Sequence, residues 1–467
     1  MSMLQIDAPA PPRSDRLMRA GLWLRDHRRT VMGLQWGVVV IYAVLLIGPV
    51  LMPLPPAGAH IWNNLTLLAQ FLFWGVWWPG VLLSMLVFGR LWCGLFCPEG
   101  ALSEFASRHG RGRTTPKWVR WRGWPFAAFV LTTVYGQLVS VYQYPLPVFL
   151  ILGGSTAAAM LVGWMYGRNK RVWCRYLCPV NGVFGLLSKL APVHFAVDRD
   201  QWDRKIHARE SMAPFTCAPL VPVRTMQGAS PCHMCGRCAG FRDAVELKAR
   251  RPDHEVVHVA GDSASVWDSL LIITGLMGVA VGAFQWSASP WFVTAKQAAA
   301  SWLVRHGMIW PLEQTLPWYL LTNYPGRNDV LTLLDGTLLL GYIAAAAGVM
   351  TLAVGLPLAG AVRLTGRWSW QRFHHLAHGL IPLAAIGVIL GLSAMTVTQL
   401  RADGFALGWM QAARFWALAA ASLGSVWLLA RILGQSAQGV RRVAAAAVAS
   451  GALLAPLAAW WLLFWHW

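Results

Sequence analysis

The sequence carries little charge for its length. Of its 467 residues, 12% are Asp, Glu, Lys or Arg, whereas 56% are hydrophobic and 28 residues are tryptophan. A soluble globular domain has about 25% charged residues. Apolar runs of about 18 residues or more recur along the chain, and this length is sufficient to cross the hydrocarbon core of a bilayer. A soluble protein is therefore excluded, and we expect an all-α polytopic membrane protein.

Acidic residues are scarcer than basic ones. The chain has 19 acidic and 39 basic residues, which gives a formal charge of +20. A basic surplus can indicate nucleic-acid binding, but here the basic residues form short clusters between apolar runs, as the positive-inside rule predicts. We therefore expect a lipid bilayer as partner and no nucleic acid. The clusters lie at 13–29, 108–122, 168–171, 197–252, 363–372 and 431–442.

The apolar runs predict about nine transmembrane helices. One orientation, with the N-terminus in the cytoplasm, places all six basic clusters on the cytoplasmic side and leaves basic-poor loops opposite. The sequence thus predicts a multi-pass protein of a bacterial inner membrane. The expected spans are 31–52, 66–89, 125–144, 148–167, 265–287, 336–358, 377–397, 406–430 and 443–464, and the opposite loops are 53–65, 145–147, 288–335 and 398–405.

Two segments outside the spans need separate interpretation. Arg28 and Arg29 precede the first apolar run, as in a twin-arginine signal. Because the run at 31–52 is longer than the roughly 7–15 residues of a signal core, we expect a retained anchor. The loop 288–335 is rich in tryptophan and proline, which predicts an amphipathic segment at the outer membrane interface.

Cysteine is absent from the apolar spans. All eight cysteines lie at span ends or in the loop after the fourth span, which this topology assigns to the cytoplasm. Because that compartment is reducing, disulfides are disfavoured and metal or redox ligation is favoured. The eight are Cys93, Cys97, Cys174, Cys178, Cys217, Cys232, Cys235 and Cys238.

Three motifs carry seven of these cysteines. The sequence RLWCGLFCP at 90–98 matches RVWCRYLCP at 171–179, and each copy ends a helical hairpin; CHMCGRC follows at 232–238. In the bacterial ferredoxin run, C-x2-C-x2-C-x3-C-P, three cysteines hold one cubane and the fourth holds its neighbour. Here that run is split, and eight thiolates predict two [4Fe-4S] clusters. Two zinc sites are the alternative, but zinc usually takes paired C-x2-C knuckles, which these motifs match poorly.

The same motifs resemble those of the membrane polyferredoxins of the NapH/NosR/CcoG-like type, over residues 30–260. The resemblance implies two [4Fe-4S] clusters on the cytoplasmic face that move electrons to or from the membrane. Members of this type accompany nitrate and nitrous-oxide reductases, and relatives act in oxidase assembly as copper reductases. The chain departs from the pattern where Cys238 is followed by AGFR without the usual Cys-Pro. We expect Cys217 to take the place of this missing cysteine as the fourth ligand beside the triple at 232–238.

The grouping of the cysteines has two alternatives. In the first, the four cysteines of the CxxxCP motifs share one cluster and Cys217 joins the triple at 232–238. In the second, as in a ferredoxin, Cys97 or Cys178 serves the triple instead. Four parts of the chain are expected: a basic cytoplasmic segment, two helical hairpins, a cytoplasmic ferredoxin-like loop and a five-helix membrane domain, at 1–30, 31–190, 191–262 and 263–467.

Three histidines, His374, His375 and His378, stand at the start of the seventh expected span. Histidines at i and i+4 can bind a metal, and one near the interface can exchange a proton with a quinone. The alternative is a cytoplasmic cap beside the arginines of 363–372. Haem is not expected, because His27 and His466 lie at other depths and no span supplies a partner imidazole.

Two classes of function fit these features. The first is an electron carrier, rather than a catalytic subunit, that passes electrons between a quinol or cytoplasmic donor and a respiratory reductase or oxidase-assembly complex. The second is a transporter or copper-reductase-like assembly factor with regulatory clusters. The later spans show no paired broken helices, and only Arg414 brings a charge to any depth within them. The sequence therefore favours electron transfer.

Overall fold

The computed structural model describes residues 15–56, 58–207 and 215–467. Arg13 and Arg209, which belong to two of the basic clusters, lie outside these residues. Within the described residues the chain is mainly helical, with two small antiparallel two-stranded sheets. These are β1 (Val193–Val197) with β2 (Val245–Ala249), and β3 (Asn323–Tyr324) with β4 (Asp329–Val330).

Eight helices of the described part are long and apolar enough to cross a membrane, and they correspond to eight of the nine expected spans. The all-α polytopic architecture is thereby confirmed. The remaining segment, 125–144, forms α7 (Trp124–Leu138), which has 15 residues and a length of about 22 Å. It ends early because the chain turns at Ser140, whose φ of 50° is left-handed. The eight are Arg28–Leu51, Leu65–Phe88, Pro145–Tyr166, Val266–Gln285, Leu333–Leu364, Trp370–Ala402, Met410–Leu433 and Gly439–His466.

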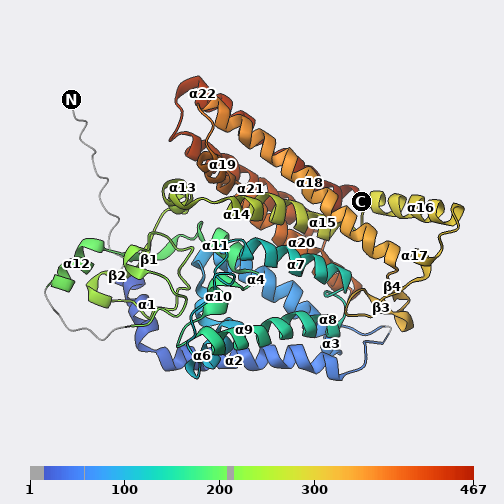
Figure 1. Ribbon diagram of the computed structural model, residues 1–467, viewed down its shortest axis with the longest axis horizontal. Helices are drawn as coiled ribbons and strands as arrows, with labels where there is room; N and C mark the ends of the chain where they lie inside the picture. Colours follow the sequence, from blue (N-terminus) through green and yellow to red (C-terminus); the bar gives the residue numbers. More distant parts are fainter. Residues whose placement is uncertain (1–14, 57, 208–214) are drawn as a thin grey trace.

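The first half of the chain contains a structural repeat. In each copy a long apolar helix is followed by a five-residue helix and then by a helix that lies at the same end of the molecule (Figure 1). Each long helix is interrupted by a π-helical segment, at Phe71–Trp77 and at Phe149–Gly153. The first copy comprises α3 (Leu65–Gln70), α4 (Trp78–Phe88), α5 (Leu91–Leu95) and α6 (Pro98–Arg108), and the second α8 (Pro145–Val148), α9 (Gly154–Tyr166), α10 (Val172–Tyr176) and α11 (Asn181–Ser188).

The loop with the last four cysteines packs under the N-terminal helix. This loop contains β1, β2 and α12 (Arg199–His207) around a small core that includes Phe195, Val245 and Met234. The N-terminal α1 (Asp15–Asp26) crosses β2 so closely that a Cβ on Gly21 would lie 3.1 Å from Cβ of Leu247. The N-terminal segment therefore helps to fix the cysteine loop, and α2 (Arg28–Ile47) continues from it into the membrane-spanning bundle.

The C-terminal half joins the first half through one continuous hydrophobic core. Met85 of α4, Leu187 of α11, Ile272, Val354 and Leu429 are all buried in it. These later elements are α13 (Ala260–Ser263), α14 (Val266–Ser269), α15 (Ala280–Gln285), α16 (Pro290–Arg305), α17 (Trp310–Glu313), α18 (Leu333–Leu364), α19 (Trp370–Ala377), α20 (Ile381–Ala402), α21 (Met410–Leu433), α22 (Gly439–Ser450) and α23 (Leu454–Trp461).

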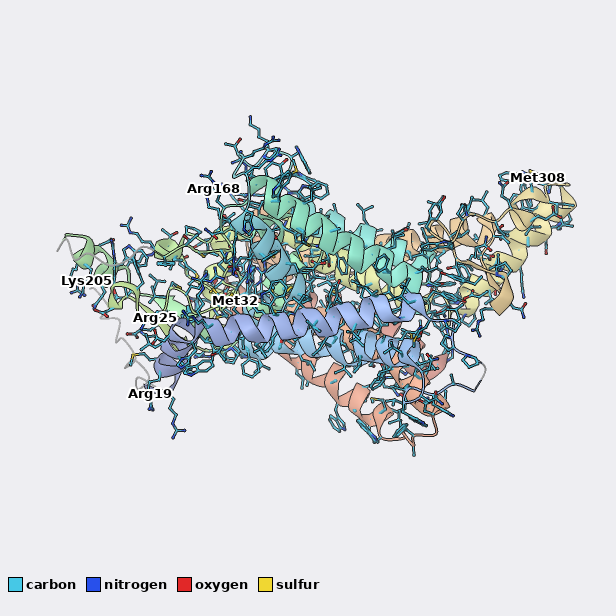
Figure 2. All side chains as sticks on the ribbon, turned by 90° about the horizontal axis from the view of Figure 1, so that it is seen from below. Arg19, Arg25, Met32, Arg168, Lys205 and Met308 are labelled. Carbon is cyan, nitrogen blue, oxygen red and sulfur yellow. The ribbon has the colours of Figure 1, made fainter. Side chains whose placement is uncertain are left out.

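The two ends of the molecule differ in composition. The loop with α12, β1 and β2 lies at one end, and α16, α17, β3 and β4 lie at the other (Figure 1). Figure 2 shows Arg19, Arg25, Arg168 and Lys205 at the first end and Met308 at the second. Basic clusters that are distant in sequence are therefore brought to one end of the helical bundle.

Candidate metal centre

The two CxxxCP motifs fold in the same way. Cys93 is the third residue of α5 and Cys174 the third of α10. The backbone N–H of Cys97 donates to the carbonyl oxygen of Trp92 at 2.9 Å, and that of Cys178 to Trp173 at 3.0 Å. A proline after the second cysteine of each motif disfavours helical backbone at that cysteine and so ends the turn. The repeat in the sequence thus becomes a repeated hydrogen-bonded turn.

The first residue of each motif is an arginine that reaches across to the other copy. Arg90 donates to Oδ1 of Asn181 at 2.6 Å, and Arg171 donates to the carbonyl oxygen of Cys93 at 2.6 Å. Arg171 also pairs with Glu104 of α6 at 2.8 Å. Both arginines are buried, with 5% and 2% of their surface exposed. The two hairpins are therefore interlocked at the level of their cysteines.

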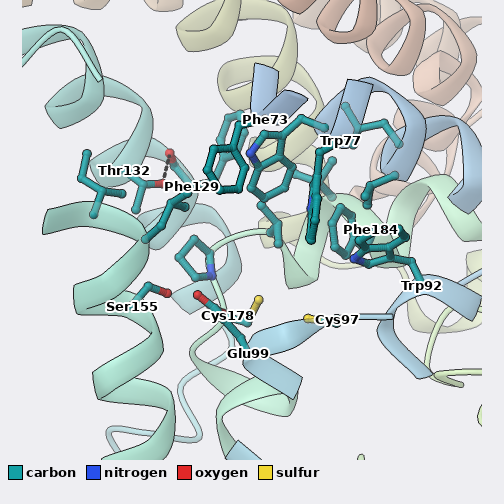
Figure 3. A pocket seen from close by; sticks show the side chains of 18 of the residues that line it. Phe73, Trp77, Trp92, Cys97, Glu99, Phe129, Thr132, Ser155, Cys178 and Phe184 are labelled. Atoms are coloured by element: carbon teal, nitrogen blue, oxygen red, sulfur yellow. Dashed lines mark hydrogen bonds between the residues drawn. The ribbon is translucent and has the colours of Figure 1, made fainter. Parts of the chain in front are cut away.

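The four cysteines of these motifs line one cavity of about 240 Å³. In the close view of Figure 3, the sulfur atoms of Cys97 and Cys178 face each other at one side of this cavity. Cys93 and Cys174 are buried beside them. The structure therefore brings together the four thiols of the repeat, two from each hairpin.

The other four cysteines form a second group. Cys217 lines a separate small cavity together with the three cysteines of 232–238, and neither Cys97 nor Cys178 lines it. Left-handed backbone at Met234 and Gly236, with φ of 53° and 73°, forms the tight turn of the triple. This arrangement corresponds to the first of the two groupings expected from the sequence. The assignment of the cysteines as ligands stays a prediction.

The two groups lie next to each other. A Cβ on Gly94 would be 2.1 Å from the carbonyl oxygen of His233, so the first cysteine motif touches the backbone of the third. His233 lines both cavities. Glu104 pairs with Arg171 at 2.8 Å and with Arg237 at 2.5 Å, and thereby links α10 to the triple. This close approach explains why residue 94 is glycine, whereas Arg175 stands at the equivalent position of the second copy.

Burial makes ionisation of these thiols unfavourable. It raises the pKa of Cys232 to about 12 and that of Cys174 to about 12, although Arg171 acts in the opposite direction on Cys174. It also raises the pKa of Cys97 and of Cys178 well above the usual value. Metal ligation requires thiolates, so positive charge must come from a bound metal group and the neighbouring arginines.

Unsatisfied polar atoms around the cysteines test whether an iron–sulfur group fits. Nε of Arg90, Nη2 of Arg171 and Nδ1 of His233 are buried without a hydrogen-bond partner. Such atoms are rare in folded proteins. A [4Fe-4S] cluster with four thiolates carries net negative charge and sulfur acceptors, and Arg90 and His233, which line the cavity of the CxxxCP cysteines, would lie beside it. The residues present therefore fit this group.

A zinc site, the alternative to an iron–sulfur cluster, requires closely spaced thiolates. Four thiolates on one zinc ion, at Zn–S distances of about 2.3 Å, have sulfur atoms roughly 3.8 Å apart. Within residues 15–56, 58–207 and 215–467, no three His, Cys, Asp or Glu side chains are close enough to hold a single metal ion. The choice of iron–sulfur clusters over zinc at these cysteines stays a prediction.

The three histidines each have a different partner. His374 bonds to the Ser269 hydroxyl at 2.8 Å, and His375 to the Val256 carbonyl oxygen at 2.8 Å. Nε2 of His378 lies 2.8 Å from Nζ of Lys189. The rings therefore connect α19 and the residue after it to α14, to the segment 255–259 and to Lys189. Within the described residues they are not part of a group of three side chains that could hold a metal ion. Their role toward a quinone or proton stays a prediction.

Several residues of the site were not assigned a role from the sequence. Arg90 and Arg171 were visible only as matching letters of the repeat, which is the signal that could have identified them. Glu104 lies outside the motifs. Burial raises the pKa of Glu104, but Arg171 and Arg237 outweigh this effect and keep the pKa below its usual value. The sequence gives no indication of a role for His233 other than its position between two cysteines.

Comparison with known proteins finds a 4Fe-4S binding domain in the part of the chain that forms the two hairpins. Residues 70–117 and 149–197 match a 4Fe-4S binding domain, and these ranges contain the two CxxxCP motifs. The putative electron transport protein YccM of Escherichia coli is 22% identical over 228 residues, which are 43% of this chain and 62% of YccM. Protein NirI of Paracoccus denitrificans is 27% identical over 34% of this chain and 26% of NirI.

A ferredoxin-type protein is also similar to part of this chain. The methylamine utilization ferredoxin-type protein MauN of Methylorubrum extorquens is 28% identical over 26% of this chain and 45% of MauN. The chain thus covers less than two thirds of the length of each of these relatives. No solved structure matches it significantly.

Proposed function

We propose that this chain, a polyferredoxin-like membrane protein with a 4Fe-4S binding domain, is an electron carrier with two [4Fe-4S] clusters. One cluster would be held by the four cysteines of the CxxxCP motifs, and the other by Cys217 with the triple at 232–238. The observation that carries the proposal is the adjacency of two four-thiol groups, with His233 lining both cavities. When bound, such clusters supply one-electron redox chemistry.

The protein's own residues prepare the first site for a negatively charged group. Arg90 and Arg171 are buried beside the thiols, and their positive charges favour thiolate over thiol there. The backbone N–H of Gly100 points to Sγ of Cys97 at 3.4 Å. Interlocked hairpins hold these groups in place, so little rearrangement would accompany a change of charge. Burial also limits contact with water.

The electron donor and acceptor belong to the proposal as well. The carrier would pass electrons between a quinol or a cytoplasmic donor and a respiratory reductase or oxidase-assembly complex. The basic residues at the cysteine end support a cytoplasmic location of both clusters in a bacterial inner membrane. The name of YccM, an electron transport protein, is consistent with this role.

Metal analysis of anaerobically purified protein tests the proposal. We expect about eight irons and about eight acid-labile sulfides per chain, with electron paramagnetic resonance signals from two interacting clusters after reduction. Stoichiometric zinc without labile sulfide would contradict it. If the iron and sulfide contents are half of these values, the proposed electron-transfer function remains compatible with the result, but the second cluster is rejected.

A further inference from the structure

Four arginines gather where α1 meets α2. They line one small cavity of about 30 Å³, which we call the arginine pocket, and they are Arg25 of α1, Arg28 of α2, Arg108 of α6 and Arg237 of the cysteine triple. This pocket is separate from the cavity of the CxxxCP cysteines. Its arginines come from three parts of the chain that are far apart in the sequence, so the fold concentrates positive charge at this point.

Acidic side chains do not balance this charge. Glu104 is the one acidic residue that lines the arginine pocket, and its carboxylate already pairs with two arginines. Arg25 pairs with the neighbouring Asp26 at 2.7 Å. Within the residues that the structure describes, the Arg28 guanidinium has no ion pair or hydrogen bond, and that of Arg108 donates only to a methionine sulfur. Two guanidinium groups therefore lack an anion, which a ligand can supply.

The arginine pocket lies where a membrane-spanning helix begins. Arg28 is the first residue of α2, and Met32, labelled in Figure 2, is one helical turn further along it. Nη2 of Arg108 lies 3.4 Å from the sulfur of Met32. After a further turn, the ring of Trp36 meets that of Phe105 of α6, with centroids 5.4 Å apart. Along the contact of α2 with α6, a layer of arginines is thus followed by a layer of aromatic rings.

The aromatic layer is the start of an exposed apolar row. Trp36 and Phe105 are 37% and 40% exposed, and α2 continues with the exposed side chains of Val40 and Val44. Residues four apart on a helix lie on one face, so Trp36, Val40 and Val44 form a row along α2. A membrane span covers such a row with acyl chains. Positive charge at the end of an apolar row has the polarity that complements an anionic phospholipid.

We propose that the arginine pocket binds the phosphate of an anionic phospholipid, whose acyl chains lie along the exposed row of α2. A volume of about 30 Å³ holds about two or three water-sized oxygens, which suits one phosphate group. Guanidinium groups match phosphate oxygens in geometry as well as charge. The carboxylate of an acidic protein would also fit, but such a partner would leave the apolar row uncovered. Because Cys235 lines the pocket, the lipid binds beside the cysteine triple.

Native mass spectrometry of the full-length protein in detergent gives the direct test. The probes are dioleoylphosphatidylglycerol and, as the lipid without net charge, dioleoylphosphatidylcholine. We expect the parent to prefer the anionic lipid, and Arg28→Gln/Arg108→Gln to bind it at least about tenfold more weakly. Arg29→Gln/Arg113→Gln is the matched control, because it removes the same charge from two exposed arginines that do not line the pocket. The control should keep the parent's preference.

A second variant guards against misfolding. Arg28→Gln removes a guanidinium that has no internal partner to lose, so it should keep the parent's thermal midpoint and bind the anionic lipid roughly fivefold more weakly. Equal losses in the pocket and control variants would show general charge attraction and overturn the site. Absence of any preference in the parent, or unchanged binding by Arg28→Gln, would also overturn it. Displacement of the lipid by millimolar inorganic phosphate would assign the pocket to free phosphate and reject a lipid.

Discussion

Arg171 donates a hydrogen bond of 2.6 Å to the backbone carbonyl oxygen of Cys93, so a side chain of the second cysteine motif holds the main chain of the first. Its counterpart Arg90 reaches in the opposite direction, to Asn181 at 2.6 Å. The two copies of the repeat are thus held together by the same residue of each motif. A four-thiol group shared between two hairpins requires such a constraint, because neither hairpin supplies more than two of the thiols.

Loss of the Arg171 side-chain charge should dismantle the first site. Arg171→Gln leaves the buried Glu104 with only Arg237 and removes the bond to Cys93. Breaking a buried pair in this way costs about 3–5 kcal/mol. We expect loss of about half of the iron and a lower midpoint of thermal unfolding.

Arg168→Gln is the matched control, because Arg168 is exposed in the same loop. It should retain full iron content. The double variant Arg171→Gln/Glu104→Gln should recover part of the stability, because the buried Glu104 carboxylate is then no longer left with Arg237 as its one cationic partner. Equal iron content in Arg171→Gln and the parent would contradict a role in the site.

The contact between Gly94 and His233 gives a second prediction. Gly94→Ala would place a Cβ 2.1 Å from the His233 carbonyl oxygen and 3.0 Å from the Cys235 nitrogen, so the first and third cysteine motifs must separate. We expect weaker paramagnetic coupling between the clusters and partial loss of both. Arg175→Ala, at the equivalent position of the other copy, should leave the coupling intact. Similar spectra for both variants would show that the close approach is unimportant.

The cysteine groups themselves predict selective effects. Cys235→Ser should abolish the signal of the cluster at the triple and leave much of the other, because an alkoxide is a poor substitute for a thiolate. Cys174→Ser should do the reverse. Paramagnetic resonance of reduced protein, with iron analysis, distinguishes the two. If Cys97→Ser removed the signal that Cys235→Ser removes, the ferredoxin-like exchange of ligands would be the correct grouping.

The fold class and the cysteine motifs were predictable because both depend on local patterns. Apolar run length identified eight long helices, and the repeat at 90–98 and 171–179 identified two equivalent turns. The run at 125–144 is longer than the helix that it forms, because apolar length alone does not reveal that α7 ends at Leu138 before the turn at Ser140. Hydropathy reports composition, whereas the helix end depends on backbone geometry.

The contacts between motifs could not be read from the sequence. Glu104 pairs with Arg237 across 133 residues, and Lys189 meets His378 across 189. Such pairs depend on how helices pack, and one sequence contains no record of this. For the same reason the sequence left two groupings of the cysteines open. The histidines at 374–378 had a recognisable spacing, but their partners lie on other elements.

The buried carboxylate of Glu255 predicts a pH dependence. It accepts from the backbone N–H of Ala229 at 2.6 Å and pairs with Arg250 at 2.6 Å. Burial raises the pKa of Glu255, but Arg250 outweighs it and holds the pKa below the ordinary value of 4.5. The folded state thus binds this proton less readily than the unfolded state. The stabilisation is fully present above about pH 4.5 and is lost as pH falls through the folded-state pKa.

Glu255→Gln should remove this contribution. We expect its thermal midpoint to lie below that of the parent at pH 7 and to approach it as the pH falls below 4.5, measured by intrinsic fluorescence. Glu246→Gln, on the nearby strand β2 and partly exposed, is the control and should keep the parent's pH profile. A constant difference between Glu255→Gln and the parent at all pH values would contradict the titration of this group.

The charge difference between the two ends predicts the orientation in the membrane. Asp200 of α12 lies at the basic end, and Glu313 of α17 lies in the loop at the other. Both are exposed acidic residues, so Asp200→Cys and Glu313→Cys are matched probes. Under the positive-inside rule, a membrane-impermeant maleimide applied to spheroplasts should label Glu313→Cys only, and Asp200→Cys should be labelled once the membrane is permeabilised. The reverse pattern would place both cysteine groups on the outer side. A cytoplasmic donor or acceptor could not then reach them.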